Sequence, residues 1–210
     1  MFKFLKPLPA LSSLVLFLCL SVSVFAAVSP TAFVKQGIDE VLLVFNNKNI
    51  DSSQRRAALQ KRIRKVIKEH FEFRSISKSV LATNWRKATG YEQDRFVDFF
   101  TQTLENTYLN AIESYSGEEI KYVGEKIKND RAVVDTIIVS KNNDIPVSYK
   151  LKLTGDQWFV YDVVIENVSM VSNYRNMYAA IIGKSGVDGL LLNLETGLKK
   201  TSTGLSKTAK

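Results

Sequence analysis

Few side chains in this sequence could transfer protons or attack a substrate. His70 is the single histidine among 210 residues, and it follows Lys68 and Glu69 at the end of a basic helix-forming segment. That place favours a role at a helix terminus or on the surface over a general base, because a cation stabilises the partial negative charge at the end of a helix. One histidine and one cysteine provide no set of metal ligands. The sequence therefore predicts neither a metal site nor a catalytic histidine.

Asp162 is the one charged residue in an otherwise apolar segment that is typical of a β-strand. Because an unpaired carboxylate is costly to bury, this side chain needs either water or hydrogen-bond donors. In a wet, cone-shaped α+β pocket it could act as a base, as in ketosteroid-isomerase-like folds. We favour a structural clamp, in which an arginine or backbone N–H groups hold the carboxylate, and Arg175 is the candidate arginine.

Basic residues gather on one helix-forming segment, opposite its apolar side. They are Arg55, Arg56, Lys61, Arg62, Arg64, Lys65 and Lys68. The plain interpretation is a solvated helix face. The alternative is a docking surface for an acidic partner or for anionic lipid headgroups, formed by Arg55, Arg56, Arg62 and Lys65.

The first residues predict export. Lys3 and Lys6 precede an apolar run of about a dozen residues, shorter than the roughly 20 that a helix needs to cross a bilayer. Small residues follow at Ala26 and Ala27, so we expect residues 1–26 to be a cleaved signal peptide. The only cysteine, Cys19, lies in this segment, and disulfides and thiolate metal sites are therefore not expected in the mature chain.

The charge of the chain constrains its partners. Loss of the two lysines of the signal peptide lowers the formal net charge from +8 to +6, which is still basic. Outside the cytoplasm such a protein meets anionic membrane surfaces and acidic protein faces, whereas nucleic acid is normally absent. We therefore expect no nucleic-acid partner.

Hydrophobic periodicity divides the mature chain into two halves. Apolar residues recur at helical spacing over 34–45, 59–67, 76–87 and 91–115. After Gly117 the period changes to two, which predicts strands near 120–123, 132–140, 147–154 and 158–165. The last of these is apolar at both odd and even positions, which predicts a central strand covered on both faces. Helices over 174–184 and 187–199 follow, and then a polar tail over 201–210.

This order of elements predicts one α+β domain over residues 27–200. Several helices should pack on one side of a curved antiparallel sheet of about four strands, with an NTF2-like or cystatin-like shape. The many apolar and aromatic side chains are most simply the core. The alternative is an internal cavity for an apolar ligand, which a helix-covered curved sheet readily leaves.

The segment from Trp158 to Glu166, with Val168-Ser169 and Asn173-Tyr174-Arg175 after it, resembles the signature of the MlaC, or toluene-tolerance Ttg2D, family of periplasmic phospholipid-binding proteins. Further matches are Leu81, Trp85, Arg95, Phe96, Phe100, Leu104, Thr107, Tyr108, Gly186, Asp188, Gly189 and Leu190. Asn167 and Ala82 depart from the pattern, since the family usually has glycine at both positions.

The resemblance implies a non-catalytic, monomeric carrier in the periplasm of a Gram-negative envelope, with phospholipid as its cargo and no cofactor. It also implies exchange of lipid with an inner-membrane ABC transporter that presents an MCE-domain protein and with an outer-membrane lipoprotein–porin complex. Such exchange would maintain the lipid asymmetry of the outer membrane. An isomerase-type enzyme that uses Asp162, and an adaptor that docks through the basic helix 52–70, are the alternatives.

A carrier of this kind must keep acyl tails away from water. Exposure of roughly 30 methylenes at about 0.8 kcal/mol each would cost on the order of 25 kcal/mol. The charged headgroup is costly to bury and should stay at the rim of the cavity. We expect the cavity to be lined by alternate strand residues and by side chains of neighbouring helices: Tyr108, Ile112, Val134, Ile138, Val147, Tyr149, Leu151, Val163, Ile165, Met170 and Met177.

Overall fold

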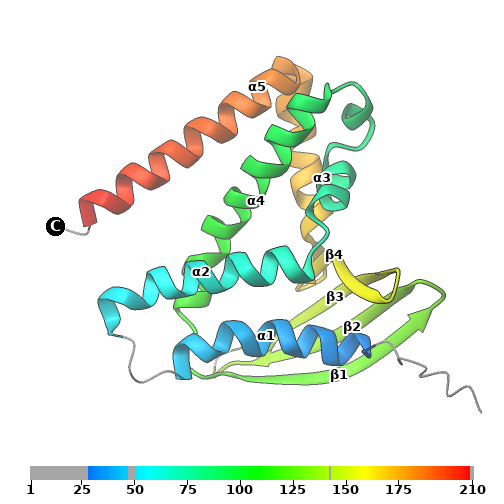
Figure 1. Ribbon diagram of the computed structural model, residues 1–210, viewed down its shortest axis with the longest axis vertical. Helices are drawn as coiled ribbons and strands as arrows, with labels where there is room; N and C mark the ends of the chain where they lie inside the picture. Colours follow the sequence, from blue (N-terminus) through cyan, green and yellow to red (C-terminus); the bar gives the residue numbers. More distant parts are fainter. Residues whose placement is uncertain (1–27, 47–50, 142, 209–210) are drawn as a thin grey trace, which may run out of the picture.

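The computed structural model describes residues 28–46, 51–141 and 143–208. The predicted signal peptide lies outside the described residues. In the described part, helices lie on one side of an open antiparallel sheet (Figure 1), which confirms the predicted single-domain α+β class. Among these residues no helix has the length and apolar character that crossing a membrane requires.

The helices follow the predicted periodicity with two differences. Their bounds are α1 (Pro30–Asn46), α2 (Ser52–His70), α3 (Phe73–Leu81), the 3-10 helix η1 (Ala82–Arg86), α4 (Gly90–Glu113) and α5 (Met170–Thr208). The helix predicted over 76–87 is divided at Ala82, whose φ of 50° ends α3. Helix α5 contains both predicted C-terminal helices and continues to Thr208, through most of the segment predicted as a polar tail.

Helix α5 changes direction sharply at Gly186. This residue has φ 69° and ψ −175°, a backbone conformation that is open to glycine and strained for other residues. The first half of α5 rises from the sheet beside α4, and the second half descends on the far side of the turn (Figure 1). One continuous segment therefore packs against α4 and extends the helical layer.

The sheet is a meander in the order β1-β2-β3-β4-β5, with every pair antiparallel. Its strands are β1 (Glu119–Lys128), β2 (Arg131–Val139), β3 (Ile145–Thr154), β4 (Gln157–Ile165) and β5 (Val168–Ser169). The turn before β5 holds Glu166 and Asn167 at φ 47° and 65°. Both positions that depart from the family pattern, Asn167 and Ala82, thus have the positive φ that glycine adopts most easily.

The prediction that β4 is a central strand covered on both faces is wrong. Beyond β4 lie the two-residue β5, which pairs with Val164 and Ile165, and a single parallel bridge from Phe71 to Val160, so β4 has no full strand on this side. The register of β3 and β4 shifts between Lys150 and Leu151, which leaves Tyr161 as an extra residue. This bulge inverts the alternation of β4. Even-numbered apolar residues before the bulge, such as Val160, and odd-numbered ones after it, such as Val163, therefore lie on the same face of the sheet.

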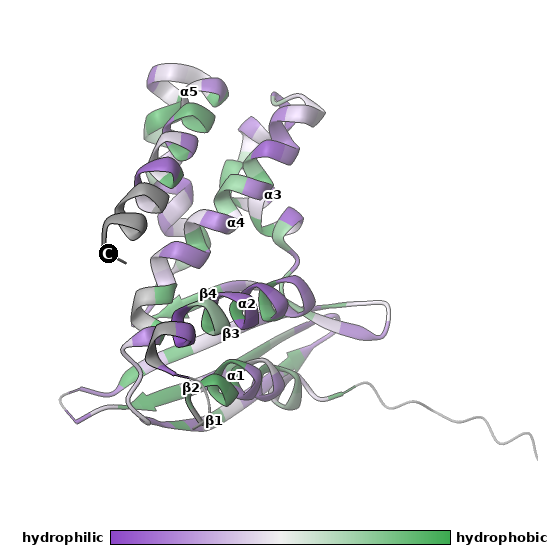
Figure 2. Ribbon diagram, turned by 60° about the vertical axis from the view of Figure 1, so that its left-hand side comes forward, coloured by the Kyte–Doolittle hydropathy of each residue, from purple (hydrophilic) through white to green (hydrophobic). Residues whose placement is uncertain are grey.

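The two faces of the sheet differ in cover and in chemistry. We call the face that includes Val134, Tyr149, Leu151, Val160 and Val163 the inner face, because α1 packs on it. The opposite face, which we call the outer face, includes Lys126, Lys128, Arg131, Lys150 and Lys152. Figure 2 shows hydrophobic segments on the strands and on the helices above them.

The core is divided into three clusters. A bundle cluster joins α3, α4 and α5 around Phe96, Phe100 and Tyr178. A sheet cluster places Phe33 and Val34 of α1 on the inner face. A third cluster joins α1, α2 and α4, and its buried side chains are those of Val44, Leu59, Ile63 and Leu109. The inner face therefore packs mainly against α1, and Phe71 joins the sheet cluster to the bundle cluster.

Candidate functional site

Seven of the eleven predicted cavity residues come from strands, and all seven lie on the inner face. Register pairs Val134 with Tyr149 and Tyr149 with Val163, and cross-strand partners share a face. The remaining four of these seven strand residues are Ile138, Val147, Leu151 and Ile165. Because the bulge at Tyr161 precedes Val163 and Ile165, both residues face the helices together with Trp158 and Val160.

Burial along the inner face is uneven. Val134 and Leu151 are 0% exposed beneath α1, whereas Tyr149, Val163 and Ile165 remain partly accessible. Burial nevertheless raises the pKa of the Tyr149 phenol, so this side chain is surrounded by protein atoms. Burial also raises the pKa of its neighbour Tyr122 to about 12. Tyr149, Val163 and Ile165 thus form a partly accessible part of the inner face.

The four predicted cavity residues on helices lie in different places. Tyr108 packs at the edge of the bundle cluster, where burial raises its pKa, and Ile112 packs against the cluster of α1, α2 and α4. Met170 is buried in the bundle cluster, whereas Met177 is 49% exposed on α5. The structure thus brings the strand residues together but does not gather these four helix residues beside them.

Asp162 is buried and fully engaged with donors. Its carboxylate, 5% exposed, accepts hydrogen bonds from the Ser169 hydroxyl at 2.7 Å, the Val171 N–H at 3.1 Å and the Lys150 ammonium at 3.1 Å. The bond to Val171 caps the first turn of α5. Arg175 lies elsewhere, since its Nε donates to the Ser79 carbonyl at 2.8 Å. A carboxylate held this way has no free face for abstracting a substrate proton.

The sequence showed that Asp162 would be costly to bury, but it did not show which side chains would donate hydrogen bonds to it. Lys150 belongs to the neighbouring strand, and the bulge at Tyr161 turns Asp162 toward Lys150 and Ser169 on the outer side. Arg175 is only a few residues further along α5, but it points to α3. Closeness along the chain therefore did not identify Lys150 as the cation that donates to Asp162.

The basic side chains of α2 mostly pair with acids of neighbouring helices. The ion pairs are Arg56–Glu113, Arg62–Glu40, Arg64–Glu105, Lys65–Glu40 and Lys65–Glu69. Arg55 is partly buried, and its Nε has no hydrogen-bond partner among the described residues. Three of the four predicted docking residues, Arg56, Arg62 and Lys65, thus join α2 to α1 and α4 within the molecule. Much of the charge of this helix is neutralised internally.

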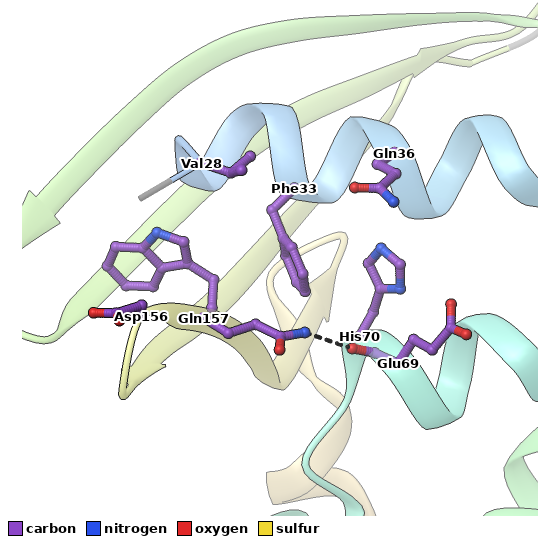
Figure 3. Close-up of a pocket in the computed structure, with 8 residues that line it drawn as sticks. Val28, Phe33, Gln36, Glu69, His70, Asp156 and Gln157 are labelled. Atoms are coloured by element: carbon purple, nitrogen blue, oxygen red, sulfur yellow. Dashed lines mark hydrogen bonds between the residues drawn. The ribbon is translucent and has the colours of Figure 1, made fainter. Parts of the chain in front are cut away.

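A small pocket lies where the start of α1, the end of α2 and the β3–β4 turn meet (Figure 3). Its volume is about 290 Å³. It is lined by Val28, Phe33, Gln36, Glu69, His70, Asp156, Gln157 and Trp158. Gln157 Nε2 donates to the Glu69 carbonyl at 3.4 Å, which ties the turn to α2.

His70 is the last residue of α2, which agrees with the expected place at a helix terminus, but it is buried in this junction rather than on the surface. The residue is 4% exposed, and its ring centroid lies 4.5 Å from that of Phe33. A Cβ atom on Gly37 would lie 2.9 Å from His70 Cδ2, so glycine is what allows α1 to approach the imidazole. The pKa of His70 is lowered, mainly because burial disfavours the cation, although Glu40 and Glu69 oppose the shift.

Stability is expected to fall on acidification because of His70. The unfolded chain binds a proton near its ordinary pKa of about 6.5, whereas the folded chain binds it at lower pH. The stabilising contribution is therefore complete above about pH 6.5 and is lost as the pH falls toward the folded-state pKa. Urea unfolding of the wild type and a His70→Leu variant at about pH 7.5 and 5.5 measures it. The variant should lose less stability, and an equal loss in both proteins would contradict this assignment.

Metal ligands do not converge in the described part of the chain, which holds no group of three or more His, Cys, Asp or Glu side chains placed to share an ion. The chemistry that the inner face offers is apolar contact. Apart from Glu125 at the β1 edge, which accepts hydrogen bonds from Thr31, its accessible side chains carry no ionisable group other than the tyrosine phenols. Such a surface can bind hydrocarbon and exclude water.

Comparison with known proteins gives matches over most of the chain. Residues 35–196 match the family described as MlaC protein. The intermembrane phospholipid transport system binding protein MlaC of Haemophilus influenzae is 22% identical over 176 residues, which cover 81% of this chain and 82% of that protein. The toluene tolerance protein ttg2D of Pseudomonas putida is 29% identical over 116 residues, 54% of each chain.

A solved structure has the same fold. The phospholipid-binding protein from Ralstonia solanacearum, determined in complex with a phospholipid, superposes with a TM-score of 0.73 at 21% identity. The match covers 83% of this chain and 99% of that one. The range 35–196 extends from α1 into the second half of α5 and includes all five strands. These matches show that the chain belongs to the MlaC family.

Proposed function

We propose that this protein is a soluble periplasmic carrier that encloses the acyl tails of a phospholipid between the inner face and the helices above it. The partly accessible inner face around Tyr149 carries this proposal, because Tyr149, Val163 and Ile165 share that face and keep accessible apolar surface there. The relative from Ralstonia solanacearum, which has the same fold, was determined with a phospholipid bound.

The helical cover is arranged so that it could admit tails. Helix α1 closes the inner face over Val134 and Leu151, whereas the bundle cluster and the cluster of α1, α2 and α4 are separate bodies of apolar side chains. Tails that enter where these clusters meet would gain apolar contact without disrupting any one of them. The cost of transfer through water, on the order of 25 kcal/mol for roughly 30 methylenes, explains why enclosure is needed.

The pocket beside His70 is a poor candidate for the tails. Its volume of about 290 Å³ is near the lower limit of the roughly 300–1,000 Å³ typical of sites for drug-sized ligands. Glu69, Asp156 and the two glutamines add polar groups that hydrocarbon cannot satisfy. We therefore assign the tails to the inner face.

The transport role extends this proposal to partners. The chain would exchange phospholipid with an inner-membrane ABC transporter that presents an MCE-domain protein and with an outer-membrane lipoprotein–porin complex, and so maintain outer-membrane asymmetry. Membership of the MlaC family supports this role, as does the Haemophilus influenzae relative, which is the binding protein of an intermembrane phospholipid transport system. The mechanism needs no bond to form or break, since the cargo is only bound and released.

Lipid analysis of the purified protein tests the cargo. The full chain is expressed in a Gram-negative host, purified from the periplasm and extracted with organic solvent. Mass spectrometry should find near-stoichiometric phospholipid, whereas an unrelated periplasmic protein purified in the same way should carry little. Repeated preparations that are empty, and that also take up no fluorescent phospholipid from vesicles, would contradict the proposal.

The two alternative functions have less support. An isomerase-type base needs Asp162 in a wet pocket, whereas this carboxylate is 5% exposed and held by three donors. An adaptor that docks through the basic helix needs free charge on α2, whereas most of its cations, Arg56, Arg62, Arg64 and Lys65, are in internal ion pairs. Neither alternative uses the partly accessible inner face.

A further inference from the structure

The outer face of the sheet carries six basic side chains drawn from three neighbouring strands. They are Lys121, Lys126, Lys128, Arg131, Lys150 and Lys152. In Figures 1 and 2 the described helices lie on the side of α1, and none of them covers this face. The side chains of Lys126, Lys128 and Arg131 are exposed, and those of Lys150 and Lys152 are partly exposed.

Strand register places like charges directly opposite one another on this face. Lys128 pairs with Arg131, and Arg131 pairs with Lys152, so three cations form a row across β1, β2 and β3. Lys126 and Lys150 flank Val133 in the next row. Like charges at directly opposed positions lower the stability of a sheet. The arrangement therefore lowers the stability of the sheet unless an anion shares it.

The acids of the protein neutralise this face only in part. Lys121 lies 3.7 Å from Glu119, Arg131 lies 3.9 Å from Asp130, and Lys150 lies 3.1 Å from the buried Asp162. Lys126, Lys128 and Lys152 form no ion pair with any described residue. The cations of α2, by contrast, mostly pair with acids of α1 and α4. Unshared positive charge is thus concentrated on the sheet, and on the basic helix it is confined to side chains such as Lys61 and Lys68.

Apolar and aromatic side chains lie among these cations. Val133, Ile137 and Phe159 are partly exposed on the same face, and the Arg131 guanidinium lies 4.7 Å from the centre of the Tyr161 ring. Five of the six cations are lysines, which present compact charges on flexible stems rather than the planar fork that binds one carboxylate in fixed geometry. A basic, aromatic-containing open face of this kind suits an interface of mobile anionic groups.

We propose that the outer face docks on the anionic surface of a phospholipid bilayer. Lipid headgroups move laterally, so they can supply phosphates to cations that are spread over a sheet and form no cleft. A single acidic protein would instead have to match the spacing of the cations in both rows. Docking in this orientation leaves the helical side free for exchange of cargo. The inference goes beyond the proposed function, since it concerns contact with the membrane and not the lipid that is carried.

Vesicle binding tests this surface. The purified protein is co-sedimented with vesicles of phosphatidylcholine alone and of phosphatidylcholine mixed with phosphatidylglycerol. Binding to the anionic vesicles should be stronger and should weaken as salt is added, since salt screens exposed charges. Both vesicles offer the same acyl tails, so uptake of cargo alone would give no difference. A triple variant, K126E/K128E/K152E, should bind the anionic vesicles at least about tenfold more weakly.

A matched variant controls for net charge. Lys61, Lys68 and Lys184 are exposed, lie off the sheet and form no ion pair with a described residue, so K61E/K68E/K184E changes the charge equally. This control should bind nearly as well as the wild type. The sheet variant should also melt no lower than the wild type, because K128E and K152E place opposite charges beside Arg131.

Three results would overturn the proposal. They are failure of the wild type to prefer anionic vesicles at low salt, undiminished binding by the sheet variant, and an equal loss in the control. Capture of an acidic protein without vesicle binding would count against it as well. Extraction of phospholipid from the same preparations distinguishes membrane docking from the carriage of lipid, because the sheet variant should lose vesicle binding and retain its cargo.

Discussion

An Asp162→Ala variant is expected to melt well below the wild type. The substitution removes the acceptor of the Ser169 hydroxyl and the Val171 N–H, and it leaves Lys150 without its carboxylate partner. Loss of a helix cap and of buried hydrogen bonds should cost about 2–4 kcal/mol. For a domain of this size, that cost lowers Tm by about 5–12 °C. Circular dichroism during heating, together with urea unfolding, measures the effect.

The control for this variant is Asp144→Ala. Asp144 is exposed in the β2–β3 turn, and its removal should change stability by less than about 0.5 kcal/mol. At a temperature where the Asp162 variant is folded, it should still carry phospholipid, since the carboxylate stabilises the start of α5 and lies outside the proposed cavity. Wild-type stability in the Asp162 variant would contradict its role as a clamp.

A Val163→Trp variant is expected to lose most of its co-purified phospholipid. Val163 lies on the inner face opposite Tyr149 and is partly accessible, so an indole there would occupy the space proposed for the tails. Overpacking of about 1–3 kcal/mol would weaken lipid binding by roughly 5- to 150-fold. Phosphate analysis of organic extracts, normalised to protein, measures the loss.

The neighbouring residue provides the control for size. Val164 lies on the same strand and is partly exposed on the opposite side of the sheet, so Val164→Trp adds the same bulk outside the proposed cavity. Melting curves of both variants show whether the fold is kept. Equal amounts of phospholipid in two folded variants would remove the inner face from the proposed site.

Local patterns in the sequence predicted much of the fold and part of the site. Helical periodicity depends on residues three and four apart, and it located α1, α2, α4 and both halves of α5. Strict alternation from Val147 to Leu153 in β3 predicted which side chains share a face, and the register confirms this. The strand residues of the predicted cavity are therefore placed together.

Features that depend on contacts between distant elements were not predictable in this way. The bulge at Tyr161 arises from pairing of β4 with β3. In a strand without a bulge, apolar residues at both odd and even positions would lie on both faces of the sheet, which is why the sequence suggested a strand covered on both sides. Much of the charge of α2 is neutralised by Glu40, Glu105 and Glu113, which lie on α1 and α4. His70 is buried because Gly37 of α1 leaves room for its ring, a contact between residues far apart in the chain.

The opposed chemistry of the two sheet faces has a consequence for how this chain can vary in length. Side chains alternate between faces along a strand, so deletion of one residue within β3 would carry Lys150 or Lys152 to the side of the hydrocarbon and Tyr149 or Leu151 to the side of water. A bulge absorbs one such step, as Tyr161 does in β4. Relatives should therefore gain and lose residues in the turns between strands, and a strand that changes by one residue should acquire or lose a bulge.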